Sequence, residues 1–489
     1  MNKGFNIRLV LRMMGSLVLI ESMILLAICL VPLIYGEDDV LYFLYSSGIC
    51  LIFGGLGLFF GRNPAPTIGK REGSVIVTFT WIIFTLFGLL PFWLSGSIPS
   101  FSDAFFETMS GFTTTGASIL NNIEELSHGM LFWRSFTHWI GGLGIIVISL
   151  ALLPVFGVSG TQLFAAESTG PTKDKIHPKI NEIAKRLFLI YIILTISETI
   201  LLRMGGMNWF DALCHSFSTI ATGGFSTKQA SIAYWDSPYI QYIIILFMIL
   251  SGVNFSLYYF AVTNKLNKIR ENEELHYYLI TLFFFAIIVA LSLIDFSKIQ
   301  SFHTMEQAWR DALFTVSSLM TTTGFCTADY MFWKPLTWVI LLLVMLTGAS
   351  AGSTSGGIKM IRIVISAKAI YHEFKRLIHP NAVVPVRYSK HLVREDIVTR
   401  VLAFTLLYLV ITAFGILILA ISGMGFLESI GGLITCLGGV GPGLGLVGPS
   451  GNFANVPEFS KWFLSFIMLI GRLELFTVLL LFTPAFWKK

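Results

Sequence analysis

Charged side chains are scarce in this sequence. Asp, Glu, Lys and Arg make up 12% of its 489 residues, and 55% are apolar. A soluble domain carries about twice that share of charge, so the composition excludes an ordinary soluble protein and indicates helices in contact with lipid. The net charge is +5, but the basic residues form no clustered face, which excludes a typical nucleic-acid-binding protein.

Cysteine is also rare, and the five cysteines are scattered without a Cys-x-x-Cys pair. An odd number at such spacings excludes a disulfide framework or a cysteine metal site. The sequence also lacks His-Glu-x-x-His, Gly-x-Ser-x-Gly and Walker motifs, and no helix carries paired carboxylates. We therefore predict that the protein is not an enzyme.

Long apolar segments are what the chain does contain. Ten of them are about as long as a bilayer span, which takes roughly 20 residues. The first is too long for a signal peptide and has no clear cleavage site after it, so we expect it to be retained. These segments predict an all-α polytopic membrane protein, with crossings near residues 13–35, 40–61, 74–95, 133–156, 187–204, 239–262, 276–296, 335–365, 398–422 and 459–483.

The basic residues predict the orientation of these crossings. An even number of crossings puts both termini on one side, and 25 of the 33 Lys and Arg residues fall in loops on that side. The positive-inside bias then predicts that both termini are cytoplasmic. The other eight basic residues are Arg134, Arg203, Lys228, Lys298, Arg310, Lys334, Lys461 and Arg472.

A motif occurs four times between pairs of apolar segments: an acidic residue followed thirteen residues later by a glycine in a Thr/Gly-rich run. The pairs are Asp103 and Gly116, Asp211 and Gly224, Asp311 and Gly324, and Glu428 and Gly441. Four copies at one offset predict a pseudo-fourfold arrangement of helix–pore loop–helix repeats around one ion pore. The expected organisation is a two-helix N-terminal domain (1–71) and repeats at 72–170, 171–270, 271–390 and 391–489.

Each copy predicts a short helix that ends inside the membrane. Ser102 or Asp103, and then Asp211, Asp311 and Glu428, are expected to cap these helices. Their carbonyl ends and the following irregular backbone would then line an ion path. No carboxylate lies in the runs, which favours a monovalent cation over calcium. The candidate filter residues are Thr114, Thr115, Gly116, Thr222, Gly223, Gly224, Thr322, Thr323, Gly324, Gly439, Val440 and Gly441.

With these four runs, the chain resembles the Trk/Ktr/HKT superfamily of potassium transporters from about residue 72 to its end. The two leading helices and the length make it most similar to the TrkH/TrkG branch. The resemblance implies K⁺ as the transported ion, a bacterial inner-membrane homodimer, and a cytosolic nucleotide-binding TrkA-type ring as partner, with no nucleotide bound on this chain. The family's filter glycines match Gly116, Gly224, Gly324 and Gly441. The fourth run, LGGVGPG, departs from the others because it has no threonine.

The eighth span contains ten small or flexible residues, which a straight helix would not favour because each glycine costs about 1 kcal/mol relative to alanine. We interpret them as an unwound stretch, and the resemblance implies an intramembrane loop that blocks the pore; close helix packing is the alternative. The stretch comprises Gly348, Ala349, Ser350, Ala351, Gly352, Ser353, Thr354, Ser355, Gly356 and Gly357.

Arg472 is the second candidate gating residue. A charge in mid-span should face the protein interior or water. In a pore of this kind it would oppose cations below the filter, and the resemblance favours that role; an ion pair with Glu474 is the alternative. The basic segment 368–400 follows the gate span and is either a docking surface for a regulator or a consequence of topology alone.

Three functional alternatives remain open at this stage. The protein could be an ion-coupled (H⁺ or Na⁺) potassium symporter, a sodium-selective relative, or a secondary transporter for a small solute. Transporters of the last kind often use inverted repeats, whereas the charge bias here orients all four repeats alike. Buried polar residues that could form ion pairs or a proton path are Glu21, His138, Glu198, Arg203 and His215.

Overall fold

The computed structural model describes residues 5–64, 69–152, 180–294, 302–381 and 384–488. The expected boundary between the first two repeats, at residues 170 and 171, lies outside these ranges. The described chain consists almost entirely of helices, with one small two-stranded hairpin.

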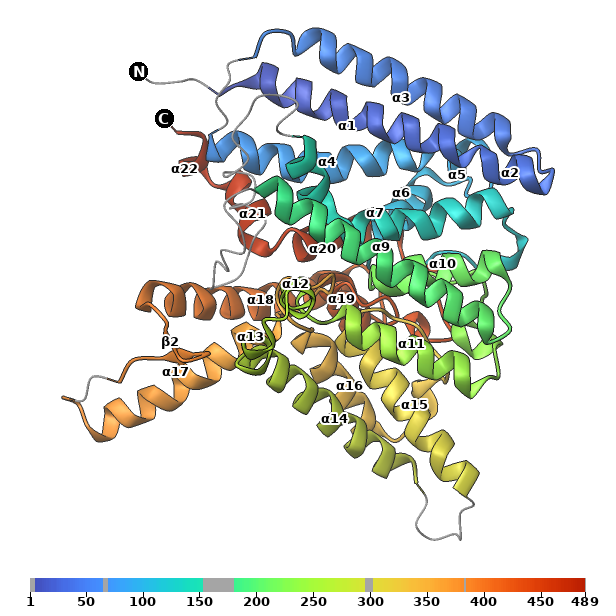
Figure 1. Cartoon of the computed structure of the whole chain (residues 1–489). Coiled ribbons are helices and arrows are strands. Elements are labelled where there is room, and N and C mark those ends of the chain that lie inside the picture. Colours follow the sequence, from blue (N-terminus) through green and yellow to red (C-terminus); the bar gives the residue numbers. More distant parts are fainter. Residues whose placement is uncertain (1–4, 65–68, 153–179, 295–301, 382–383, 489) are drawn as a thin grey trace.

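Two helices lead the chain and pack side by side along one edge of the molecule (Figure 1). They are α1 (Ile7–Ile28), which continues as α2 (Leu30–Tyr35), and α3 (Val40–Phe60). Glycines allow this close approach: a Cβ atom on Gly15 would lie 2.8 Å from the carbonyl oxygen of Gly54. Small residues at such contacts let membrane helices approach closely.

After this pair, one order of elements recurs four times: a first helix, a shorter helix and an interrupted second helix. The first helices are α4 (Lys70–Gly88) with α5 (Leu90–Leu94), α9 (Ile180–Met204), α14 (Glu273–Leu293) and α18 (Glu395–Ile421). The shorter helices are α6 (Phe101–Phe112), α10 (Trp209–Ile220), α15 (Phe302–Met320) and α19 (Phe426–Gly438). The second helices are α7 (His128–Leu152), α11 (Pro238–Ser251) with α12 (Phe255–Val262), α16 (Pro335–Thr347) with α17 (Met360–Ile378), and α20 (Glu458–Arg472) with α21 (Leu475–Leu479).

The remaining elements are short. Strands β1 (Arg387–Tyr388) and β2 (His391–Leu392) pair antiparallel in a hairpin between α17 and α18. This hairpin lies in the basic segment 368–400, where the all-α prediction contained no strand. The other pieces are α13 (Leu266–Arg270), α22 (Pro484–Trp487) and the 3-10 helices Ile123–Glu125, Ser231–Tyr234, Tyr330–Phe332, Gly445–Val447 and Leu480–Phe482.

Neither Ser102 nor the acidic residues of the four motifs cap the shorter helices, so that prediction was wrong. Ser100 caps α6 by accepting a hydrogen bond from the Asp103 N–H, and Asn208 caps α10 in the same way through Asp211. Both acids lie in the first turn, where a negative charge still meets the positive helix end. Glu428 also lies in the first turn of its helix, whereas Asp311 is inside α15, which begins at Phe302.

Each second helix is interrupted. Gly144 breaks α7 with a φ of 64°, α11 and α12 meet at 94°, and α20 and α21 meet at 116°. The third interruption is the longest and extends from Gly348 to Lys359. Four interruptions at comparable places leave backbone groups free of helical partners, which a membrane protein tolerates only where protein or water satisfies them.

The structure is that of a multi-pass membrane protein. Among the described residues, six helices are long and apolar enough to cross a membrane, and the two bent pairs bring the number to eight. The other two predicted crossings correspond to α7, whose predicted end at 153–156 lies outside the described residues, and to α16, its interruption and α17. Both described chain ends lie together (Figure 1), and the rings of Phe5 and Trp487 are 5.8 Å apart.

Candidate functional site

The four Thr/Gly runs meet one another in cyclic order. The last glycines of the four predicted motifs all have a positive φ, between 80° and 104°, and each lies against the next run along the chain. A Cβ added to the glycine would press on a carbonyl oxygen of that next run: Gly116 on Gly223, Gly224 on Thr323, Gly324 on Val440, and Gly441 on Thr115 at 3.0 Å. The last contact returns to the first run, so the four runs form a closed ring.

The backbone alternates in the same way in every run. The residue two before each glycine also has a positive φ, at Thr114, Thr222, Thr322 and Gly439. Such an alternation allows successive carbonyl groups to face the same side of a strand. The positive φ also explains why the fourth run can have a glycine where the others have threonine. Gly439 adopts this conformation without strain, whereas the threonines adopt it at a cost.

Each run is fixed to the end of its own short helix. The N–H of the residue before each of these four glycines donates to a carbonyl five residues earlier, in the pattern that closes many helix C-termini. These bonds are Thr115 to Ser110 (2.9 Å), Gly223 to Ser218 (2.8 Å), Thr323 to Ser318 (2.8 Å) and Val440 to Thr435 (2.9 Å). The partial negative ends of four helices therefore face the ring.

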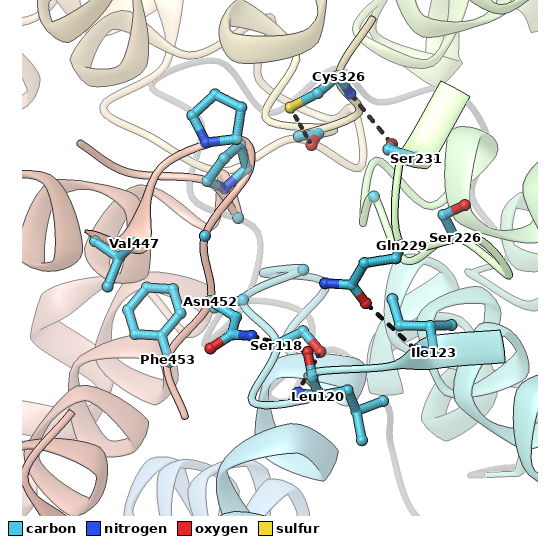
Figure 2. A pocket seen from close by; sticks show the side chains of 18 of the residues that line it. Ser118, Leu120, Ile123, Ser226, Gln229, Ser231, Cys326, Val447, Asn452 and Phe453 are labelled. Atoms are coloured by element: carbon cyan, nitrogen blue, oxygen red, sulfur yellow. Dashed lines mark hydrogen bonds between the residues drawn. The ribbon is translucent and has the colours of Figure 1, made fainter. Parts of the chain in front are cut away.

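A pocket opens on the ring, and Gly116, Gly224, Gly324 and Gly441 all line it. Its volume is about 80 Å³. Figure 2 shows residues of all four repeats around it, among them Ser118, Gln229, Cys326 and Asn452. The basic residues Arg134 and Lys228 also contribute, and no carboxylate does among the described residues that line it.

Two buried side chains, Glu107 and Arg134, stabilise the first two runs. Glu107 on α6 accepts hydrogen bonds from Ser118 Oγ (3.0 Å) and Ile119 N (2.8 Å), and pairs with Arg134 Nε at 2.7 Å. Arg134 also donates to the carbonyl of Ser226 at 2.8 Å, which joins the first repeat to the second. The residue equivalent to Glu107 in the second repeat is His215, whose Nε2 lies 2.9 Å from Ser226 Oγ.

The interrupted stretch 348–357 lies beneath the ring and contacts three of its repeats. The Gly356 N–H donates to Thr322 Oγ1 at 2.8 Å in the third run. Thr354 Oγ1 donates to the carbonyl of Ile220, at the end of the second short helix, at 3.0 Å. Gly356 also lies against the carbonyl of Gly438 in the fourth repeat, so closely that a Cβ would clash.

Arg472 completes this layer. Its Nη1 donates to the Thr354 carbonyl at 2.8 Å, and its Nη2 donates to the Gly141 carbonyl in the first repeat. Glu474, the predicted alternative partner, accepts a hydrogen bond from Arg362 of α17. The stretch 348–357 and Arg472 together therefore contact all four repeats directly below the ring.

The chemistry of this arrangement is that of neutral oxygen ligands. Backbone carbonyls and threonine hydroxyls can replace the water shell of a monovalent cation. Groups of His, Cys, Asp and Glu that could hold a tightly bound metal are absent from the part of the chain that the structure describes.

Sequence reasoning missed several residues of this site. Glu107 and Arg134 are 27 positions apart and carry no shared motif. Arg362, which donates to Glu474, also belongs to no motif. The one available signal for Glu107 was its position four residues after Asp103, on the same helix face as the acidic residue.

Comparisons with known proteins agree with this architecture. The family described as "TrkH: Cation transport protein" matches residues 42–489. The "Trk system potassium uptake protein TrkH" of Escherichia coli (strain K12) is 38% identical over 99% of this chain and 100% of its own, and TrkG of the same organism is 33% identical over 99% of both. The crystal structure of "the Potassium Transporter TrkH from Vibrio parahaemolyticus" matches with a TM-score of 0.88 and 35% identity, over 99% of this chain and 100% of that one.

These names describe transport proteins, which confirms the prediction of a transport protein rather than an enzyme. The full-length structural match confirms the predicted fold class and the suspected family. With a family match over most of its residues and relatives above 30% identity along its whole length, the chain belongs to the TrkH family of cation transport proteins.

Proposed function

We propose that this protein takes up potassium ions across the bacterial inner membrane through the ring formed by the four Thr/Gly runs. The observation that carries this proposal is the closed cyclic contact of four positive-φ glycines with the carbonyls of the next runs. The names of the relatives, potassium uptake proteins of Trk systems, support potassium as the ion.

In this proposal the ring is the selectivity filter. Its ligands are the carbonyl groups and hydroxyls of residues 114–116, 222–224, 322–324 and 439–441. The fourth run contributes backbone oxygens alone, because Gly439, Val440 and Gly441 have no hydroxyl. Discrimination between K⁺ and Na⁺ then depends on how rigidly the backbone is held, and the close packing of the glycines supports such rigidity.

The stretch 348–357 and Arg472 form the gate of this pore. Gly356 of the stretch donates a hydrogen bond to Thr322 of the ring, and Arg472 donates to Thr354 within the stretch. These contacts support the role, because a cation leaving the filter would meet the two next. The Arg472 guanidinium adds an electrostatic barrier, since a positive charge opposes a cation strongly in a medium of low dielectric constant.

A cytosolic TrkA-type ring regulates the gate, and the protein works as a homodimer with both termini in the cytoplasm. The name of the relatives, members of a Trk system, supports a partner subunit. The basic segment 368–400 continues from α17, which begins where the interruption ends, and is the docking surface in this proposal.

Tracer flux tests the function. The purified protein in liposomes, with an internal potassium load, should accumulate external rubidium, and added external K⁺ should compete while Na⁺ should not. Equal competition by Na⁺ would overturn potassium selectivity. A second arm abolishes proton and sodium gradients; flux that then persists supports a channel, whereas flux that stops supports the ion-coupled symporter.

A further inference from the structure

Glu274 is a buried carboxylate next to the gate that neither the filter nor Arg472 involves. It is the second residue of α14, the first helix of the third repeat, and its exposed fraction is 2%. A buried carboxylate is costly unless hydrogen bonds compensate it. The partners of Glu274 therefore indicate why it is there.

Both partners are backbone groups of residues 348–361, here called the gate segment, which comprise the proposed gate stretch 348–357 and the start of α17. Glu274 Oε1 accepts a hydrogen bond from the Ala351 N–H at 2.6 Å and another from the Ile361 N–H at 3.2 Å. Ala351 lies near the beginning of the interruption, and Ile361 lies in the first turn of α17, just after its end. One oxygen atom thus joins the two ends of the gate segment.

Neither N–H group has a helical acceptor. Ala351 is in irregular backbone, and the first four N–H groups of a helix such as α17 lack intrahelical partners. A carboxylate at this place also favours the positive end of the helix dipole. The neighbouring Lys359 and Arg362 add positive charge near Glu274. Glu274 therefore stabilises this conformation of the segment through charge-assisted hydrogen bonds.

The residues just before Glu274 contact the cytosolic hairpin. Lys390 donates to Glu271 at 2.8 Å, and the Lys390 ammonium lowers the pKa of the Glu271 carboxyl, so the pair is charged at neutral pH. The Glu273 N–H donates to Ser389 Oγ at 3.3 Å. Lys368 on α17 pairs with Glu273 and donates to the Arg387 carbonyl at 2.9 Å. Residues 271–274 therefore contact the hairpin on one side and the gate segment on the other.

We propose that Glu274 is a positioning residue that holds the gate segment closed, and that residues 271–274 transmit movements of the 387–392 hairpin to it. This inference rests on the proposed role of residues 348–357 as the gate. A regulator that moves the hairpin would displace the start of α14, lengthen the two hydrogen bonds of Glu274 and release the segment. Such coupling requires a stable closed and a stable open arrangement of the segment.

Substitution of Glu274 tests the first part. In liposome flux assays, Glu274→Ala should raise the basal rate on the order of tenfold, the change expected from the loss of a charge-assisted hydrogen bond. Glu274→Gln keeps an acceptor oxygen without its charge and should give an intermediate rate. The ratio of K⁺ to Na⁺ flux should not change. Glu458→Ala, at the exposed start of α20, is the matched control and should leave the rate unchanged.

A labelling experiment reports on the segment itself. In a Cys326→Ser background, Ser353→Cys should react faster with a charged methanethiosulfonate when Glu274 is alanine than when it is glutamate. This readout needs only inserted, monodisperse protein and is independent of flux. Unchanged labelling together with an unchanged basal rate in Glu274→Ala would overturn the proposal.

The transmission step has its own test. Lys390→Ala combined with Ser389→Ala should weaken the response to the cytosolic regulator while Glu274 remains in place. A full response in this double variant would overturn the proposed route. Deletion within 348–357 distinguishes failure of the proposed gate from failure of the proposed role of Glu274. If the deletion raises flux and Glu274→Ala does not, the gate is supported and the role of Glu274 is wrong. Unchanged flux in both variants contradicts the gate.

Discussion

The backbone N–H of Gly356 donates a hydrogen bond to the side-chain oxygen of Thr322 at 2.8 Å. The first residue belongs to the interrupted stretch of the third repeat, and the second belongs to its Thr/Gly run. The same hydroxyl that would face a cation at the lower end of the ring thus binds the segment beneath it. In the proposed function, closure and ion binding would therefore compete for this one oxygen atom.

Thr322→Val removes this acceptor without altering branching at Cβ, so the positive φ is as strained as before. We expect basal rubidium flux to rise about twofold to tenfold, because a neutral hydrogen bond contributes about 0.5–1.5 kcal/mol. Thr222→Val is the matched control, since Thr222 occupies the same position of the second run and its hydroxyl donates to the Ala221 carbonyl instead. A larger increase in the control would contradict the competition.

Gly324→Ala should narrow the discrimination between K⁺ and Na⁺ while the protein still inserts. Gly324 has a φ of 80°, and an added Cβ would clash with the carbonyl of Val440, so the ring must widen. Gly206→Ala is the control that has the backbone strain of a positive φ without the steric clash. Gly206 has a φ of 98°, and no atom lies within 4 Å of the added Cβ. Ion competition in tracer uptake measures both variants. Equal ion preference in the two would show that Gly324 does not shape the filter.

Deletion of residues 350–355 should raise flux and leave the ratio of K⁺ to Na⁺ flux unchanged. The deletion removes the Thr354 contacts with Ile220 and Arg472 but leaves the ring intact. Steady-state tracer uptake at fixed membrane potential measures the rate, and thermal stability in detergent checks the fold. A deletion variant that folds and conducts less than the parent would count against the gate.

Arg472→Ala should also raise flux, because it removes a positive charge and two hydrogen bonds to carbonyls beneath the ring. A unit charge 4 Å from an ion contributes about 4 kcal/mol at an effective dielectric constant of 20, so even a screened effect should be measurable. Arg472→Lys should keep most of the barrier if charge is decisive. Loss of insertion in both Arg472→Ala and Glu474→Ala would instead favour a structural role for these residues.

If the basic segment 368–400 is the docking surface proposed above, neutralising its exposed basic residues should weaken nucleotide control more than it changes basal flux. We would change Lys375, Arg376 and Arg387 together to alanine and keep Lys390, which pairs with Glu271. Pull-down of a TrkA-type ring and flux with and without nucleotide give the two readouts. Unchanged binding and an unchanged nucleotide response would mean that these charges serve topology alone.

The sequence was most informative where a pattern repeats locally. The thirteen-residue offset identified the four runs, and the glycines and serines of 348–357 indicated an interruption by composition alone. Ser100 and Asn208 were overlooked as caps because the acidic residues one turn later were equally plausible. Gly144 was not identified as a break because a single glycine is common in membrane helices.

Contacts distant in sequence could not be predicted in this way. Glu274 binds backbone groups 77 and 87 residues away, and backbone groups carry no side-chain signature. Arg134 reaches a carbonyl 92 residues away for the same reason. Such contacts depend on how the repeats pack, which periodicity within one repeat does not specify.

The cyclic order of the four runs has a consequence for how such a ring can vary. In an assembly of four identical chains every substitution appears four times, whereas here a single codon changes one quarter of the ring. Gly439 stands where the other runs have threonine, so one quadrant lacks the hydroxyl that the other three have at this position. Each quadrant is free to diverge separately, yet each also lies against the next, so a change in one requires accommodation by its successor. Because the four unequal repeats belong to one chain, their order around the ring is fixed. Four different subunits would have to assemble in the correct order.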